Sequence, residues 1–150
     1  MTVKQRLLGH ALAEARAGSE EGGIPIGAAL IIDGQLIAQG RNRRVQANDP
    51  VLHAEIDCLQ RAGRMHPSHY ARATLVTTLS PCDMCAGAIL LFGIHHVIVG
   101  EHDSFRGPEQ LLRRRGVRLE VLGDPVCREL MARFTSAHPE LWAEDIGQLP

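Results

Sequence analysis

The stretch ATLVTTLSPCDMCAGAILLFGIHHVIV, which spans residues 73–99, predicts a strand, a helix and a second strand in succession. Residues 73–78 form a short run of apolar and β-branched side chains, which is typical of a buried strand. Residues 82–92 favour a helix that Gly93 ends, and residues 96–99 favour another strand. Two strands joined in this way lie parallel in one sheet, with a right-handed crossover. The stretch therefore predicts an α/β fold.

The same alternation continues toward the C-terminus. Glycine closes one helix there, and an Asp-Pro dipeptide opens another, because it is typical of an N-cap followed by proline at the first helical position. The predicted elements are a helix over 108–115, a strand over 117–122, a helix from Asp124 to about Ser136, and one or two helical turns over 139–146.

Upstream of residue 73 the sequence predicts a helix, a hairpin and a second helix. Apolar residues recur at helical spacing from Val3 to Ala15, so an amphipathic helix should open the chain and end near Gly18. Asp33-Gly34 is a strong signal for a two-residue hairpin, which makes the flanking strands antiparallel. The predicted strands cover residues 26–32 and 35–39, and the second helix opens at Asp49-Pro50 and closes at Gly63.

Together these elements predict a three-layer α/β/α architecture with a central mixed, mostly parallel five-stranded sheet and helices on both faces. The length of 150 residues fits a single domain over residues 1–150. Hydrophobic residues make up 45% of the chain and charged residues 22%, which is typical of a soluble globular protein.

Charge and hydropathy exclude two classes of partner. The net charge of -1 argues against a nucleic-acid binder, because such proteins gain much of their affinity from basic residues. No stretch approaches the ~20 apolar residues of a membrane span, and residues 1–18 contain no apolar run of signal-peptide length. We therefore expect a cytoplasmic protein that binds neither nucleic acid nor membrane.

In the cytoplasm the four cysteines are metal ligands or core residues rather than disulfides.

Two short motifs carry metal-binding residues. His53-Ala54-Glu55 and Pro81-Cys82-Asp83-Met84-Cys85 supply one imidazole and two thiols, each near the N-terminal end of a predicted helix. Three such ligands leave a tetrahedral zinc ion with one open position, which is the catalytic arrangement. We therefore expect one Zn²⁺ per chain.

Glu55 is a candidate proton carrier at this site. It follows the expected ligand His53 by two residues, so its carboxylate can take a proton from water and pass it to a substrate. An H-x-E motif with a later P-C-x-x-C is the signature of zinc-dependent base deaminases.

Less specific interpretations exist for each motif alone. A lone C-x-x-C is often a redox motif, and a non-catalytic zinc-binding module is a second alternative. Such a module would have no use for Glu55, and a structural zinc site would need a fourth ligand. Cys58 and Cys127 are poorly placed for that role and are better interpreted as buried small residues. The conjunction of the motifs favours a catalytic zinc.

Three longer stretches carry a resemblance beyond the zinc motif. They are EGGIPIGAALI at residues 21–31, TTLSPCDMCAGAI at residues 77–89, and WAEDIG at residues 142–147. With them the sequence resembles the cytidine deaminase superfamily, and within it the fungal-type cytosine deaminases, over nearly the whole chain. The resemblance implies that His53, Cys82 and Cys85 bind zinc and that Glu55 carries protons.

The resemblance also implies a set of contacts to a base. Asn42 would hold a pyrimidine at one end of the pocket through a ring N–H and a ring carbonyl, and the backbone N–H of Ala54, where the family has glycine, would assist at that carbonyl. At the other end, the backbone carbonyl of Ser80 and the carboxylate of Asp145 would accept from the exocyclic amine. The pocket would be closed or lined by Phe105, Trp142 and Ile26.

Each of these residues also has an ordinary structural interpretation. Asn42 could be a loop residue, Asp145 a solvated acid, and Trp142 a plug at the edge of the core. The resemblance further suggests a homodimer.

The expected reaction is the hydrolytic deamination of free cytosine to uracil and ammonia, with a small nucleobase as substrate. The alternatives within the superfamily are guanine, another small amino-heterocycle, or adenosine in tRNA. The tRNA alternative needs a basic face to meet phosphates, and the near-neutral composition gives it little support.

Overall fold

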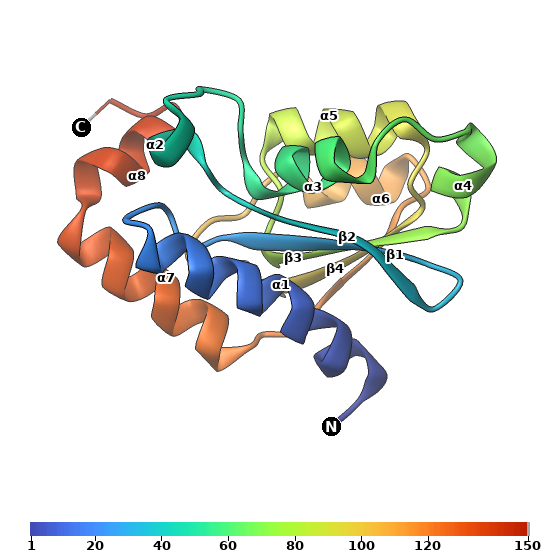
Figure 1. The fold of residues 1–150 in the computed structure, drawn as a ribbon, viewed down its shortest axis with the longest axis horizontal. Helices are drawn as coiled ribbons and strands as arrows, with labels where there is room; N and C mark the ends of the chain where they lie inside the picture. Colours follow the sequence, from blue (N-terminus) through green and yellow to red (C-terminus); the bar gives the residue numbers. More distant parts are fainter. Residues whose placement is uncertain (150) are drawn as a thin grey trace.

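The computed structural model describes residues 1–149 and contains a five-stranded sheet with helices on both faces (Figure 1). The strands are β1 (Gly27–Ile32), β2 (Gln35–Arg41), β3 (Ala73–Leu79), β4 (His96–Glu101) and β5 (Arg118–Val121). The helices are α1 (Val3–Glu20), α2 (Arg44–Ala47), α3 (Ala54–Ala62), α4 (Pro67–Ala71), α5 (Asp83–Phe92), α6 (Glu109–Arg114), α7 (Pro125–Ala137) and α8 (Pro139–Asp145). The predicted three-layer α/β/α fold is confirmed.

The strands lie in the order β2-β1-β3-β4-β5. Strand β1 is antiparallel to both of its neighbours, whereas β3, β4 and β5 pair in parallel. The sheet is therefore mixed, with β1 running against the other four strands. The turn between β1 and β2 has φ angles of 52° at Asp33 and 78° at Gly34, and both are left-handed, as the predicted two-residue hairpin requires.

The helices form two layers because the central strands β1, β3 and β4 bury both of their faces. Helices α1 and α7 cover one face of the sheet, and α3, α5 and α6 cover the other (Figure 1). Along β1, Ala28 and Leu30 pack into the core beneath α3, while Ala29 and Ile31 pack against Leu8 of α1. None of the helices within residues 1–149 is long and apolar enough to cross a membrane.

The carboxyl ends of β3 and β4 and the N-terminal ends of α3 and α5 meet at one edge of the sheet. His53 is the N-cap of α3 and Cys82 is the N-cap of α5. The backbone N–H of Ser80, just beyond β3, donates to the carbonyl of Glu101 at the end of β4 at 3.1 Å. In open α/β sheets this edge is where ligands bind.

Two predicted helix boundaries are wrong. The helix expected to open at Asp49-Pro50 begins instead at Ala54, because the Asp49 carboxylate accepts from the N–H of Val51 at 2.9 Å and so closes a turn. Helix α1 passes Gly18 and ends at Glu20.

Helix α1 continues past Gly18 to Glu20 because the glycine with a left-handed backbone is Gly22, which lies further along the chain. Gly22 has φ 83°, and the N–H of Gly23 donates to the carbonyl of Gly18 at 2.8 Å. Together with the bond from Gly22 to Ser19 at 3.0 Å, this forms a Schellman motif.

Candidate active site

His53, Cys82 and Cys85 form a cluster whose nitrogen and sulfur atoms all lie within 4.8 Å of one another. His53 Nδ1 is 3.5 Å from the sulfur of Cys82 and 3.8 Å from that of Cys85. A tetrahedral zinc ion with ordinary bond lengths separates a nitrogen ligand from a sulfur ligand by roughly 3.6 Å. The three residues therefore fit a zinc ion.

The two helix N-termini explain how the ligands converge. His53 and Cys82 have extended backbones as N-caps, which turn their side chains away from the helices and toward each other. Cys85 is the third residue of α5, within its first turn, and is fully buried. The positive end of the α5 dipole favours thiolate over thiol, which is the form that binds metal.

The electrostatics of the cluster favour a positive charge at its centre. A hydrogen bond from Cys85 lowers the pKa of Cys82 to about 4, and the same bond raises the pKa of Cys85 well above its usual value. Burial lowers the pKa of His53, but the partner Cys82 and the charges of Asp145 and Glu55 outweigh it and raise that pKa to about 9. The groups around the imidazole thus stabilise a positive charge on the ring.

Glu55 is buried beside this cluster without belonging to it. Its side chain is 4% exposed and lines the adjoining cavity. Burial raises the pKa of Glu55 to about 7; the charge of His53 acts against this rise and that of Cys82 adds to it. A carboxyl group with such a pKa can both accept and donate a proton near neutral pH.

The cavity next to the cluster holds about 290 Å³ of space free of protein atoms, its mouth included. Every residue predicted for the site lines it except Cys85, which is fully buried. The structure adds Leu79 and Ile146, which adjoin the predicted residues Ser80 and Asp145. The lining residues are Ile26, Asn42, His53, Ala54, Glu55, Leu79, Ser80, Cys82, Phe105, Trp142, Asp145 and Ile146.

Asn42 and Asp145 contact each other, so the prediction that they occupy opposite ends of the pocket is wrong. Asn42 Nδ2 donates to Asp145 Oδ1 at 2.9 Å, and Asn42 Oδ1 accepts from the N–H of Arg44 at 3.0 Å. Asn42 is 1% exposed and Asp145 is 9% exposed, which rules out an exposed loop residue and a solvated acid.

Asp145 also faces the metal cluster. Its Oδ1 lies 3.4 Å from His53 Nε2, while His53 Nδ1 points at the two thiols. A carboxylate on the far nitrogen of a histidine fixes the ring orientation and leaves the near nitrogen free for a metal. Burial raises the pKa of Asp145, and the charge of His53 and the hydrogen bond from Asn42 oppose this rise.

Phe105 and Trp142 meet edge to face over the cavity, with ring centroids 6.2 Å apart and planes at 87°. Trp142 belongs to α8, and Phe105 lies in the loop after β4. The buried Glu101 holds that loop, because its Oε2 accepts from the N–H groups of Asp103 at 2.7 Å and Ser104 at 2.9 Å.

Ser80 is held by a residue that the sequence did not single out. Its hydroxyl donates to Oε2 of the buried Glu109 at 2.7 Å and accepts from the N–H of Gly107 at 3.0 Å. Glu109 fixes Ser80 at the cavity wall through this bond.

The family profile described as cytidine and deoxycytidylate deaminase zinc-binding region matches residues 1–101, which include His53, Glu55, Cys82 and Cys85. The chain belongs to this family of zinc-dependent deaminases.

Curated and solved relatives of the deaminase agree in their chemistry. This chain is 45% identical over 139 residues to a cytosine deaminase of Candida albicans, and the match covers 92% of this chain and 93% of that protein. It is 36% identical over 108 residues to a tRNA-specific adenosine deaminase of Bacillus subtilis, covering 71% of this chain and 67% of that one. A solved guanine deaminase from Nitrosomonas europaea superimposes with a TM-score of 0.75 at 26% identity, covering 87% of this chain and 83% of the other.

Proposed function

We propose that this deaminase hydrolyses free cytosine to uracil and ammonia. The observation that carries the proposal is the small cavity in which Asn42 and Asp145 adjoin the His53, Cys82 and Cys85 cluster. The cavity is lined mostly by apolar side chains with a few convergent polar groups, which is typical of a site for a small molecule. The similarity to the Candida cytosine deaminase along nearly all of both chains supports the same substrate.

The reaction needs a nucleophile and a proton carrier. Zinc held by His53, Cys82 and Cys85 would supply Lewis-acid activation of water. Glu55 takes a proton from that water and delivers it to ring atom N3 as the oxygen bonds to C4. Glu55 then carries the remaining hydroxyl proton to the amine as the bond from C4 to nitrogen breaks. Water and cytosine are thereby converted to uracil and ammonia.

Four residues are proposed to bind the base. Asn42 Oδ1 accepts from ring N1–H while Nδ2 remains bonded to Asp145, so the two side chains act as one unit. The backbone N–H of Ala54 donates to the ring carbonyl. The backbone carbonyl of Ser80 and the carboxylate of Asp145 accept from the exocyclic amine. Phe105, Trp142 and Ile26 enclose the ring.

We expect strong preference for cytosine over cytidine. In cytidine a ribose replaces the N1 hydrogen, so Asn42 Oδ1 loses the ring donor and keeps only the N–H of Arg44. The loss of one hydrogen bond costs ~0.5–1.5 kcal/mol, about twofold to tenfold in kcat/KM. A collision of the sugar with Phe105 and Trp142 lowers the rate further. The measurement is kcat/KM for cytosine, cytidine and guanine with ammonia release as the signal. Equal rates on cytosine and cytidine would contradict the proposal, and turnover of guanine alone would assign the site to a different base.

A free base is also proposed in preference to tRNA. The net charge of -1 gives little attraction for phosphates, although an adenosine deaminase acting on tRNA is among the relatives. None of the four cysteines within residues 1–149 is in a disulfide, which supports a reducing compartment such as the cytoplasm. We propose that residues 1–150 act there as one catalytic domain in pyrimidine salvage.

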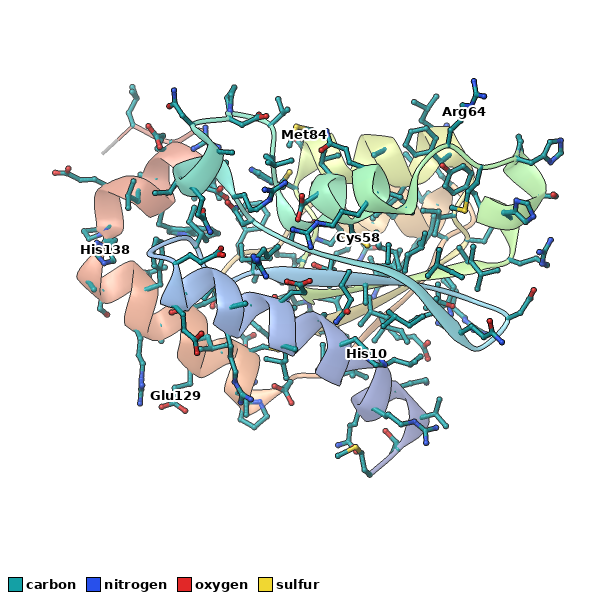
Figure 2. The ribbon with its side chains drawn as sticks, viewed as in Figure 1. His10, Cys58, Arg64, Met84, Glu129 and His138 are labelled. Atoms are coloured by element: carbon teal, nitrogen blue, oxygen red, sulfur yellow. The ribbon has the colours of Figure 1, made fainter. Side chains whose placement is uncertain are left out.

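We further propose that two copies pair through an apolar groove between α3 and α5. Arg64 and Met84 lie on the outer side of these helices (Figure 2), and Leu91 of α5 is 78% exposed. Apolar surface of this kind is typical of a protein interface. The groove is lined by Ile56, Leu59, Gln60, Gly63, Arg64, Tyr70, Met84, Ala88, Leu91 and Phe92.

Leu91→Glu should convert the dimer to a monomer, because a buried unpaired carboxylate opposes association. Light scattering after size exclusion should fall from about twice the chain mass of 16.4 kDa to that mass. Ile37→Glu is the matched control, since Ile37 is exposed on β2 outside the groove. A wild-type protein that runs as a monomer, or a Leu91→Glu variant that stays dimeric, would overturn this surface.

A further inference from the structure

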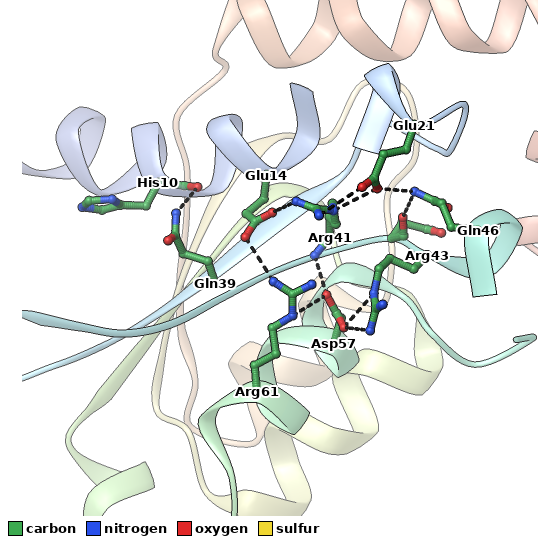
Figure 3. Close-up of polar contacts among 10 residues, drawn as sticks. His10, Glu14, Glu21, Gln39, Arg41, Arg43, Gln46, Asp57 and Arg61 are labelled. Atoms are coloured by element: carbon green, nitrogen blue, oxygen red, sulfur yellow. Dashed lines mark hydrogen bonds and ion pairs between the residues drawn. The ribbon is translucent and has the colours of Figure 1, made fainter. Parts of the chain in front are cut away.

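Asp57 is a fully buried carboxylate that accepts hydrogen bonds from Arg41 and Arg43 at the end of β2 (Figure 3). Its Oδ2 accepts the backbone N–H of Arg41 at 3.0 Å. Its Oδ1 accepts from Nε and Nη2 of Arg43 at 3.1 Å and 2.8 Å. Arg61, one turn along α3, places its Nε 3.2 Å from Oδ2.

Arg41 and Arg43 flank Asn42, the residue proposed to hold the base. Arg41 is the last residue of β2 in the ladder with β1, so Asn42 is the first residue beyond the sheet. The N–H of Asn42 donates to the carbonyl of Ile26 at 3.0 Å. Asp57 therefore holds the chain on both sides of Asn42, by a backbone bond before it and a paired guanidinium after it.

The same helix turn carries the chemistry. Asp57 follows Glu55 by two residues, and its own N–H donates to the carbonyl of His53 at 2.9 Å. One turn of α3 thus connects a metal ligand, the proton carrier and the segment that bears Asn42. We propose that Asp57 is a positioning residue, which sets the place of Asn42 relative to Glu55 and so sets the affinity for the base. The inference rests on the proposed function, in which Asn42 binds the ring.

A second carboxylate in the same network provides a control (Figure 3). Glu14 of α1 accepts from Arg41 Nη1 at 2.6 Å and from Arg61 Nη1 at 3.4 Å. These contacts reach guanidinium groups alone, whereas Asp57 also binds the backbone N–H next to Asn42. Glu14 and Asp57 therefore share a charge network and differ in their connection to the site.

The test compares Asp57→Asn with Glu14→Gln. For Asp57→Asn we expect KM for cytosine to rise roughly tenfold with kcat within about threefold of wild type, as when binding common to ground and transition states is weakened. Zinc content should stay at one per chain. Glu14→Gln should lower the melting temperature to a similar extent and leave KM unchanged. A purely structural role for Asp57 predicts the same kinetic constants in both variants, and that result would overturn the inference.

Two further measurements keep the test decisive. Arg43→Gln removes the guanidinium that pairs with Asp57. Because Arg43 is half-exposed, this variant should fold and should reproduce the KM increase even where Asp57→Asn folds poorly. Crystal structures should show the 2.9 Å contact between Asn42 and Asp145 lost in the Asp57 and Arg43 variants and retained in Glu14→Gln. An unchanged contact would refute the positioning role whatever base the wild type deaminates. A wild type that turns over guanine but not cytosine would refute the proposed substrate alone, and KM is then measured for guanine.

Discussion

Glu55→Gln should lower kcat for cytosine by roughly 10²–10⁴-fold, the usual effect of losing a positioned acid–base group. Glutamine keeps the shape of the side chain but cannot take a proton from water or return one to the base. Because Glu55 lies outside the ligand cluster, the variant should keep one zinc per chain. Steady-state kinetics and elemental analysis on the same preparation measure both quantities.

The stability of this variant provides a second check. Burial raises the pKa of Glu55 in the folded protein to about 7. As the pH rises from the pKa of the unfolded chain to this value, ionisation of Glu55 increasingly favours the unfolded chain and lowers the free energy of unfolding. The neutral amide avoids this cost, and the melting temperature at pH 8 should therefore be no lower than that of wild type. Glu14→Gln, a change of the same kind outside the cavity, should retain near wild-type kcat. Loss of zinc from Glu55→Gln would instead identify Glu55 as a ligand.

Local sequence predicted the elements of the fold where the signal acts within a few residues. The two Asp-Pro dipeptides show the limit of that approach. Asp124 accepts from the N–H of Cys127 at 2.9 Å and caps α7 as predicted. Asp49 accepts from Val51 instead and forms a turn, because the segment that follows is held elsewhere, by a bond of 3.0 Å from Arg43 N to the carbonyl of Leu52. Tertiary contacts decided between two outcomes that the dipeptide permits equally.

The candidate site was predicted residue by residue, but its connections were not. Asn42 and Asp145 are 103 positions apart, and nothing local in either segment indicates that they contact each other. Asp57 and Glu109 escaped notice because a carboxylate on a predicted helix is usually solvated. Their burial arises from partners on other elements, Arg43 after β2 and Ser80 after β3.

Cys82→Ala should reduce zinc from one per chain to a small fraction and abolish deamination. Two ligands remain in this variant, fewer than the three that a catalytic zinc site ordinarily uses. Because metal bound to the native state stabilises it, the melting temperature should fall as well, and added zinc should raise it less than in wild type. Elemental analysis, the ammonia assay and thermal unfolding measure the three effects.

Cys58→Ala is the matched control for this loss. Cys58 lies on α3 against the sheet (Figure 2), where its thiol is fully buried and lies 3.5 Å from the carbonyl of Ala38. Burial raises the pKa of that thiol to about 12, so it stays protonated and is unsuited to bind metal. Its removal should cost some stability through a small cavity and leave zinc content and turnover unchanged. Full zinc occupancy in Cys82→Ala, or loss of zinc in Cys58→Ala, would contradict the assignment of the ligands.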